Sequence, residues 1–323
     1  MLKRRLCDAE FTWKLACEGP LLIADGRYEK EKSKEGEKEK SFPDKIFISR
    51  ARSREEIRSK VRWDTPPQLS FYVPGTSLRG PFRAQAERIL RSLLGDDGAC
   101  DPFDMETEDP PRSCSKRLEV RRQDVPYAAI CPACRLFGCA GAASRVQIAD
   151  ADIGGSFKSV YRDMIGIDRF TGGAYSGAKM RFHVLEDTAF ETTVSVRNFE
   201  LWQIGLLAYV FRDFTEGLVS IGFGKSKGFG QIRGEVTKVK LTYPAGRADG
   251  RVHHLGSLCP QDRENYDLAP DDPASVSLNE LPASWPSLYK SYEVTDIGAF
   301  WRVVAPSFNA FVERREAARA ETE

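Results

Sequence analysis

Long apolar runs are missing from this sequence, and none approaches the roughly 18 residues that a membrane-spanning helix needs. Asp8, Glu10 and Lys14 also interrupt the stretch that follows the N-terminal basic residues, which argues against a secretion signal. A large net charge is missing too, because 48 Lys and Arg nearly balance 47 Asp and Glu. We therefore expect a soluble, cytoplasmic protein with no membrane partner.

Histidine is rare, and the three residues, His183, His253 and His254, lie apart from the motifs described below. Catalytic zinc sites usually contain a histidine or a carboxylate together with an open coordination position. A metal site in this chain is therefore expected to be structural rather than catalytic.

Cysteine is more plentiful, and five of the eight residues gather within one short segment. Cys131 and Cys134 are two residues apart, so that one tight turn brings both sulfurs close enough to share a tetrahedral zinc ion. Reducing conditions favour metal binding over disulfides. We expect Cys114 and either Cys100 or Cys139 to complete the site; partly buried free thiols and a redox pair are the alternatives.

Basic residues gather locally although the net charge is small. They concentrate in residues 50–62, 79–91, 112–122 and 225–240, whereas the chain beyond residue 261 leans acidic. The fold can collect such segments into a basic stripe that binds a polyanion, or they can be ordinary solvated faces.

The order of expected elements predicts an α+β fold. Alternating or apolar-rich segments predict strands, and apolar residues at helical spacing predict helices. The expected order is strand 10–23, helix 77–94, strand 146–153, strand 192–196, helix 201–214 and strand 235–243. This order is typical of a ferredoxin-like (RRM-like) sheet with insertions.

Two segments have features suited to phosphate binding. Thr76 or Ser77 would cap the helix 77–94, and Arg79 and Arg83 flank its positively polarised start. Residues 222–230 interleave four glycines with two lysines and two phenylalanines. Glycines allow a backbone to approach a phosphodiester chain closely and lysines neutralise phosphates, although the segment also suits a plain flexible turn.

Five motifs, taken in order, resemble those of CRISPR-associated RAMP proteins. They are residues 74–80 (PGTSLRG), 131–138 (CPACRLFG), 144–146 (SRV), 167–174 (IDRFTGGA) and 222–230 (GFGKSKGFG). The resemblance spans about residues 11–243 and is strongest to the backbone subunits of type III effector complexes that carry a zinc-binding insertion.

The resemblance implies a ferredoxin-like palm with a β-hairpin thumb that holds a CRISPR guide RNA beside other RAMP subunits. It divides the chain into a RAMP domain, residues 1–245, and an extension of unknown role, residues 246–323. The RAMP domain would contain a charged loop at 26–62, a zinc-binding insertion at about 96–142 and the thumb at about 160–192. The residues implied to contact RNA are Ser77, Arg79, Arg83, Arg145, Arg169, Phe170, Lys225, Ser226 and Lys227.

The resemblance also implies a catalytic aspartate ahead of residues 74–80. Asp25, Asp44 and Asp64 lie in that loop, and Asp64 best fits the family pattern because Thr65 and Pro66 follow it. Its carboxylate would hold a catalytic magnesium ion or activate a ribose hydroxyl for cleavage of complementary target RNA. The alternatives are a catalytically silent scaffold and a guide-processing endoribonuclease.

Overall fold

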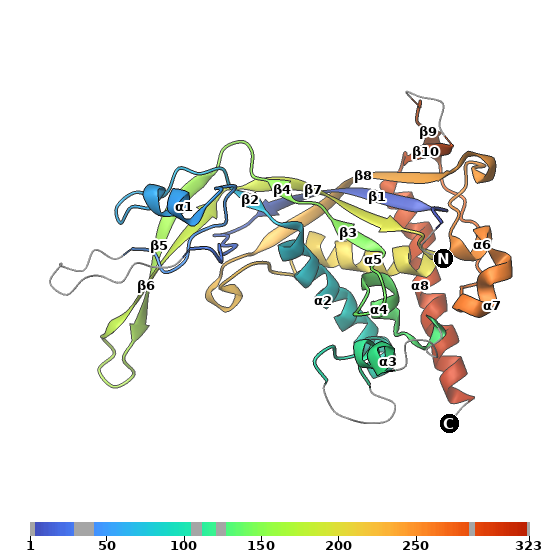
Figure 1. The fold of residues 1–323 in the computed structure, drawn as a ribbon, viewed down its shortest axis with the longest axis horizontal. Helices are drawn as coiled ribbons and strands as arrows, with labels where there is room; N and C mark the ends of the chain where they lie inside the picture. Colours follow the sequence, from blue (N-terminus) through green and yellow to red (C-terminus); the bar gives the residue numbers. More distant parts are fainter. Residues whose placement is uncertain (1–3, 29–41, 105–111, 121–126, 284–287, 322–323) are drawn as a thin grey trace.

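The computed structural model describes residues 4–28, 42–104, 112–120, 127–283 and 288–321. Its centre is an antiparallel sheet that runs horizontally in Figure 1. The strands lie in the order β3 (Val146–Ile148), β7 (Ala189–Arg197), β1 (Asp8–Cys17), β8 (Ile232–Pro244), β10 (Tyr289–Val294) and β9 (Leu278–Glu280). The expected α+β class is confirmed.

Strand β1 shows why the sheet has one buried face. Phe11, Trp13 and Leu15 alternate with polar residues, and successive side chains of a strand point to opposite faces. All three apolar side chains are fully buried. The opposite face of the central strands is polar, with ion pairs such as Lys240 to Glu10 at 2.7 Å.

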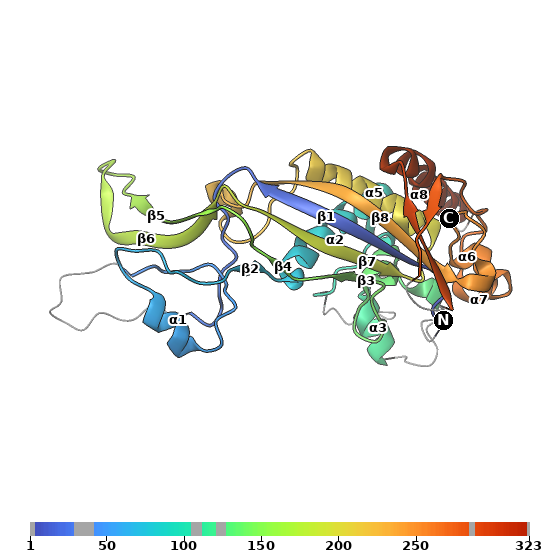
Figure 2. The ribbon, with the colours of Figure 1, turned by 90° about the horizontal axis from the view of Figure 1, so that it is seen from above.

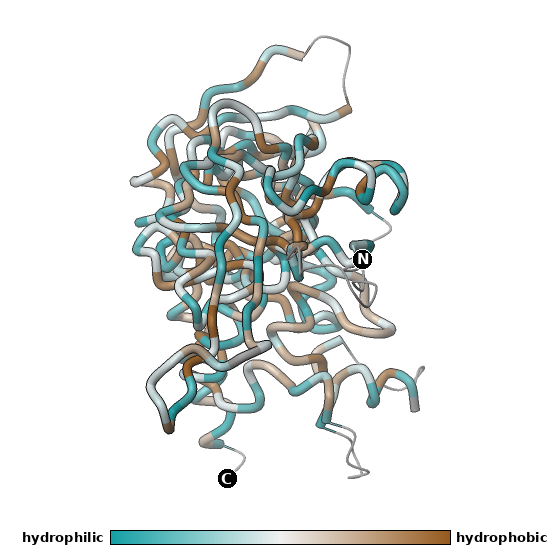
Figure 3. Tube along the Cα trace, turned by 90° about the vertical axis from the view of Figure 1, so that its left-hand side faces the viewer, coloured by the Kyte–Doolittle hydropathy of each residue, from teal (hydrophilic) through white to brown (hydrophobic). Residues whose placement is uncertain are grey.

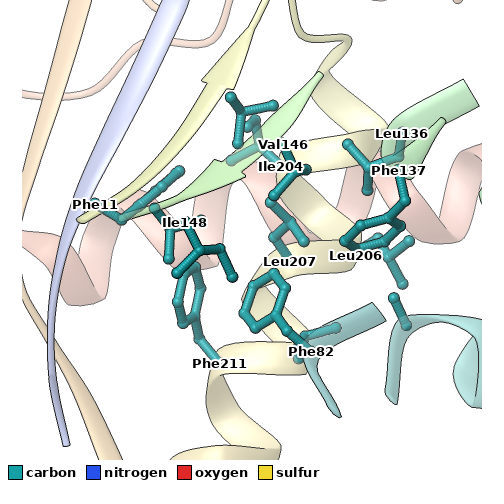
Figure 4. Packing of buried hydrophobic residues seen from close by; sticks show 14 of the residues in the cluster. Phe11, Phe82, Leu136, Phe137, Val146, Ile148, Ile204, Leu206, Leu207 and Phe211 are labelled. Atoms are coloured by element: carbon teal, nitrogen blue, oxygen red, sulfur yellow. The ribbon is translucent and has the colours of Figure 1, made fainter. Parts of the chain in front are cut away.

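Three long helices cover the apolar face of the sheet (Figures 1 and 2). They are α2 (Gly75–Leu94), α5 (Leu201–Thr215) and α8 (Ile297–Ala320). Figure 4 shows Phe211 of α5 in the shared core, where its ring centroid lies 5.4 Å from that of Phe11 of β1 and 5.2 Å from that of Phe82 of α2. Because α2 and α5 pack against the same strands, their positions relative to the sheet are fixed.

The C-terminal region packs into the same core. Trp202 of α5 stacks on Phe311 of α8 with ring centroids 4.1 Å apart, and Trp301 stacks on Phe11 at 5.6 Å. Gly205 allows this approach, since an added Cβ would lie 2.7 Å from the Val304 carbonyl oxygen. The described part of the segment beyond residue 246 is therefore packed onto the rest of the protein.

A two-stranded hairpin extends from the sheet at the left of Figure 1, formed by β5 (Lys158–Ile167) and β6 (Ala174–Glu186). Seen from that end in Figure 3, hydrophobic positions recur along it. Residues 189–192, expected in this hairpin, belong instead to β7 of the main sheet.

The insertion after β1 is more ordered than the expected charged loop 26–62. Residues 29–41, which hold most of its Glu and Lys alternation, lie outside the described residues. The rest contains helix α1 (Arg54–Lys60) over a small core of Tyr28, Ile46, Ala51, Ile57 and Val61. Both views show this segment beside the hairpin, where Lys45 pairs with Phe182 (Figures 1 and 2).

Two local predictions were wrong. The expected strand 146–153 is broken, because β4 (Ala151–Asp152) leaves the main sheet and pairs with β2 (Tyr72–Val73). Helix α2 begins before Thr76 and Ser77, with Pro74 at its N-cap. The Asp150 side chain accepts a hydrogen bond from the Gly75 amide at 2.9 Å and takes the place of the expected cap.

Short helices complete the fold: α3 (Cys114–Val120), α4 (Pro132–Phe137), α6 (Leu255–Leu258) and α7 (Arg263–Tyr266). Among the described residues, no helix combines the length and apolar character needed to cross a bilayer.

Candidate functional site

Four buried cysteines converge below the end of α2. Cys131 and Cys134 lie at the start of α4, Cys114 begins α3, and Cys100 follows the end of α2. Pro132 suits the first turn of α4, where a helix leaves its amides unpaired. Cys114, Cys131 and Cys134 lie on short helices and Cys100 lies in a loop, so the cluster brings together three separate stretches of chain.

The sulfur positions fit a tetrahedral metal ion. All four sulfurs lie within 4.8 Å of one another, and the Cys100 and Cys134 sulfurs are 3.7 Å apart. Zinc–sulfur bonds of about 2.3 Å place the sulfurs of a tetrahedral site about 3.8 Å apart. The four cysteines could therefore hold a metal ion such as zinc.

Hydrogen-bond donors around the cluster favour deprotonated sulfur. The Cys131 amide donates to the Cys114 sulfur at 3.3 Å, and the Arg117 guanidinium donates to it at 3.2 Å. Arg83 donates to the Cys134 sulfur at 3.8 Å. The thiol of Cys100 is the main hydrogen-bond partner that lowers the pKa of Cys114 and raises that of Cys134, so the cluster shares its protons unequally.

Cys139 lies beside this group but is not one of the four. It is half-buried on a turn where its amide donates to the Ala142 carbonyl oxygen at 3.0 Å. The choice between Cys100 and Cys139, left open by the spacing, falls on Cys100 in this geometry.

Arg79 and Arg83 use their guanidinium groups within the protein. Arg79 donates to the Phe137 carbonyl oxygen and, at 3.1 Å, to the Ser144 hydroxyl. Arg83 donates to the Gly138 carbonyl oxygen at 2.9 Å and to Glu87 at 2.7 Å. Both arginines therefore join α2 to the C-terminal end of α4.

Arg145 is also an internal residue, with only 3% of its surface exposed. It donates to the Asn198 carbonyl oxygen and to the Tyr127 hydroxyl. Ser77 is half-buried in the first turn of α2. The start of that helix already has an internal anion in Asp150.

The glycine-rich loop exposes its charged residues. Lys225, Ser226 and Lys227 form a single exposed turn between Gly224 and Gly228, both at positive φ. In the described part of the chain, neither lysine has an ion pair. The loop itself is anchored: an added Cβ on Gly222 would lie 2.4 Å from the Leu22 carbonyl oxygen, and Phe229 packs edge-on against Phe182 of β6.

The tip of the hairpin exposes apolar groups. Phe170 is 99% exposed, and Arg169 beside it is also exposed. The tip turn is ordered by the Asp168 carboxylate, which accepts from the Phe170 amide at 2.8 Å. Other exposed apolar residues of the hairpin are Ile165, Ile167, Tyr175 and Met180.

The structure distinguishes the three candidate aspartates. Asp25 is 1% exposed and pairs with Arg27 at 2.8 Å. Asp44 accepts from the Arg181 amide at 2.7 Å. Asp64 is exposed, its carboxylate accepting from the Thr65 hydroxyl at 3.3 Å, and it has no ion pair among the residues that the structure describes.

Two hairpin residues that sequence reasoning missed contact the Asp64 loop. The Tyr161 hydroxyl lies 2.7 Å from the Arg62 carbonyl oxygen, and Arg181 donates to the Trp63 carbonyl oxygen at 2.7 Å. About a hundred residues separate the two segments in the chain, and no local pattern marks the pairing.

The histidines are internal. His183 is fully buried between the Phe47 amide, 3.2 Å from Nδ1, and the Ser159 hydroxyl, 2.8 Å from Nε2. Burial lowers the pKa of His183 to about 3. His253 and His254 contact Asp249 and the Asp271 carbonyl oxygen in the C-terminal region.

Together these features define an α+β protein with a cluster of four cysteines that could hold a metal ion, an exposed basic loop and a hairpin with exposed apolar residues. Residues 14–233 match the family model of the RAMP superfamily. The chain belongs to the RAMP superfamily, which supports a role as a CRISPR-associated RNA-binding subunit. No curated protein matches the chain.

Proposed function

We propose that this protein is a guide-RNA-binding backbone subunit of a type III CRISPR effector complex and cleaves target RNA paired to the guide. The observation that carries the proposal is the exposed Asp64 carboxylate beside a hairpin with the fully exposed Phe170 at its tip. The tip of the hairpin would displace a nucleotide, and the carboxylate beside the base of the hairpin would act on the target backbone that runs along it.

The strand order supports a ferredoxin-like (RRM-like) palm. Strands β3, β7, β1 and β8 are neighbours in the sheet, and the chain visits β1, α2, β3, β7, α5 and β8 in turn. That order is the split β-α-β of the ferredoxin-like fold. The hairpin β5–β6 would be the thumb, inserted between β3 and β7.

We assign RNA contact to the exposed candidates and not to the internal ones. Lys225, Ser226 and Lys227 would follow the guide backbone, and Arg169 and Phe170 would meet the displaced nucleotide. Exposed lysines bind phosphates mainly through counterion release, which needs no base-specific contact. Arg79, Arg83 and Arg145 instead stabilise the palm and the cysteine site.

Zinc and magnesium would have different tasks. A zinc ion held by Cys100, Cys114, Cys131 and Cys134 would order the insertion at about residues 96–142, because four thiolates leave no open position for a substrate. Magnesium is usually held by one or two carboxylates together with substrate phosphates and water. Asp64 supplies one such carboxylate, and the target RNA would supply the phosphate.

Cleavage of a guide-complementary RNA by the reconstituted complex, with magnesium, tests the function. We expect native protein to produce regularly spaced cuts and Asp64→Ala to abolish them while guide and target binding persist. Asp96→Ala is a matched control, since Asp96 is exposed at the opposite end of α2. Native protein that binds both RNAs and never cuts contradicts the nuclease role.

The alternative is a catalytically inactive scaffold of the same complex, favoured by the number of basic residues that serve internal contacts. In that case the complex would assemble on guide RNA with other RAMP subunits and Asp64→Ala would change nothing. A guide-processing ribonuclease that uses histidine finds little support, because His183 is buried and the other two histidines lie in the C-terminal region. The role of residues 246–323 in contacting a neighbouring subunit is likewise a proposal.

A further inference from the structure

The loop that carries Asp64 is held through its backbone by side chains of the hairpin. The Tyr161 hydroxyl, on β5, lies 2.7 Å from the Arg62 carbonyl oxygen and 3.1 Å from that of Thr65. These two carbonyls flank Trp63 and Asp64. One phenol therefore closes the turn around the aspartate.

Arg181, on β6, holds a third carbonyl of the turn. Its Nη1 donates to the Trp63 carbonyl oxygen at 2.7 Å. The same guanidinium binds Asp163 through two hydrogen bonds, Nε at 2.7 Å and Nη2 at 2.9 Å, and such bidentate pairing fixes its orientation. Lys179 adds an ion pair to Asp163 at 3.0 Å.

The hairpin backbone is joined to the insertion as well. The Asp44 carboxylate accepts from the Arg181 amide, and the Asp44 amide donates to the Arg181 carbonyl oxygen at 2.6 Å. The guanidinium of Arg181 also lies 5.6 Å from the centre of the Tyr161 ring. Tyr161 and Arg181 thus form one contact set at the base of the hairpin, which we call the hairpin bracket.

The protonation states suit these contacts. Burial raises the pKa of Tyr161 to about 12, so its hydroxyl keeps the proton that it donates. The hydrogen bond from Arg181 lowers the pKa of Asp163 to about 2, so that carboxylate stays charged and keeps the guanidinium in place. The hairpin bracket keeps the same charges throughout the neutral pH range.

We infer that Tyr161 and Arg181 are positioning residues for target cleavage, which set the Asp64 carboxylate at a fixed place relative to the hairpin tip. This inference rests on the proposed function. Its consequence is that the nucleotide displaced by the tip and the bond cut near Asp64 keep a constant spacing. A displacement of about 1 Å at a reacting group can cost on the order of 100-fold in rate.

The test compares Tyr161→Phe and Arg181→Gln with native protein in the reconstituted complex, at saturating target RNA. We expect the single-turnover cleavage rate to fall about 10- to 100-fold with target affinity unchanged. More magnesium should be required for half-maximal cleavage, which a general loss of stability would not produce. Arg181→Lys, which keeps a donor for the Trp63 carbonyl oxygen, should recover part of the rate.

Arg162→Gln and Tyr175→Phe are matched controls, since both residues are exposed on the hairpin and lie outside the hairpin bracket. Native rates and magnesium dependence for Tyr161→Phe and Arg181→Gln, while Asp64→Ala is inactive, would overturn the positioning role and leave the proposed function intact. Full activity of Asp64→Ala would overturn both.

Limited trypsin digestion of the full-length chain provides a second measurement without catalysis. The bond after the exposed Arg62, whose carbonyl oxygen lies 2.7 Å from the Tyr161 hydroxyl, should be cut faster in Tyr161→Phe and Arg181→Gln than in native protein. Equal cleavage of this bond in all three proteins would show that the loop is held by other contacts and would contradict the inference.

Discussion

Basic residues near the cysteine cluster and basic residues of the glycine-rich loop have different surroundings. Arg79, Arg83 and Arg145 donate to backbone carbonyls and bury much of their length. Lys225 and Lys227 lie on an exposed turn, and Gly222 and Gly230 at the two ends of the loop pack tightly against the Leu22 and Ile221 carbonyl oxygens. The same charge therefore stabilises the fold at one end and remains available to an external anion at the other.

The contrast follows from the residue type together with its surroundings. Guanidinium groups have several donors in a plane and suit the unpaired carbonyls at the end of a short helix such as α4. Among the residues that the structure describes, the side chains of Lys225 and Lys227 donate to no carbonyl oxygen. Residues close to the cysteine site should thus respond to mutation through stability, and residues of the exposed loop through RNA affinity.

The largest expected effect is the loss of one metal-binding cysteine. Cys134→Ser should remove zinc from the purified protein and lower its free energy of unfolding by several kcal/mol, since structural zinc contributes roughly 10–16 kcal/mol in small domains. Metal analysis and thermal unfolding check this. Cys139→Ser is the matched control, because Cys139 lies outside the group of four and should keep the metal.

Equal metal loss in Cys134→Ser and Cys139→Ser would contradict the choice of four. Metal-free native protein with unchanged stability after chelation would show instead that the cluster is a set of buried thiols.

The next largest effect is expected from replacing Arg83, and it can be compared directly with replacing Lys225 or Lys227. Arg83→Ala should lower the free energy of unfolding by about 2 kcal/mol, because it leaves the Gly138 carbonyl oxygen without its partner. Lys225→Ala and Lys227→Ala should each change stability by less than about 0.5 kcal/mol. In RNA titrations at several salt concentrations, the slope of log K against log salt concentration should be smaller in magnitude by about 0.7 for each lysine variant.

Arg83→Ala should leave that salt dependence unchanged after correction for the folded fraction. If Arg83→Ala reduced the slope of log K against log salt concentration and both lysine variants kept the native slope, Arg83 and not the lysines would contact RNA.

Much of the fold could be predicted from the sequence because its signals are local. The helices expected at 77–94 and 201–214 match α2 and α5 within two residues, since apolar residues at helical spacing must face one core. The break at residues 149–150 could not be predicted, because β3 and β4 show the same alternation while joining different sheets. Alternation tells which face is buried, and not which strand is the neighbour.

The candidate site was predictable in its residue types and not in its contacts. The short spacing of Cys131 and Cys134 predicts a tight turn whose two sulfurs can bind one metal ion. The choice of Cys100 over Cys139 depends instead on where the chain goes after α2. Asp64 was identified through the family resemblance and stays a prediction as a catalytic group. Tyr161 was missed because its partners lie about a hundred residues away and are backbone carbonyls, which leave no trace in side-chain patterns.

The smallest effect concerns the base of the hairpin, where the exposed end of the molecule meets the core. His183 is buried and its pKa is lowered to about 3, so the unfolded chain binds a proton below its own pKa of about 6.5 that the folded protein excludes. The contribution of His183 to the free energy of unfolding is therefore fully present above pH 6.5. It falls by about 1.4 kcal/mol per pH unit as the pH decreases toward 3. The free energy of unfolding should be measured at pH 7 and at pH 5.5. Native protein should show this loss, and so should the control Phe170→Ala, whose side chain is exposed at the tip. The loss should be smaller in His183→Gln. An equal loss in His183→Gln would assign the acid sensitivity to other titrating groups and would contradict the role given to His183.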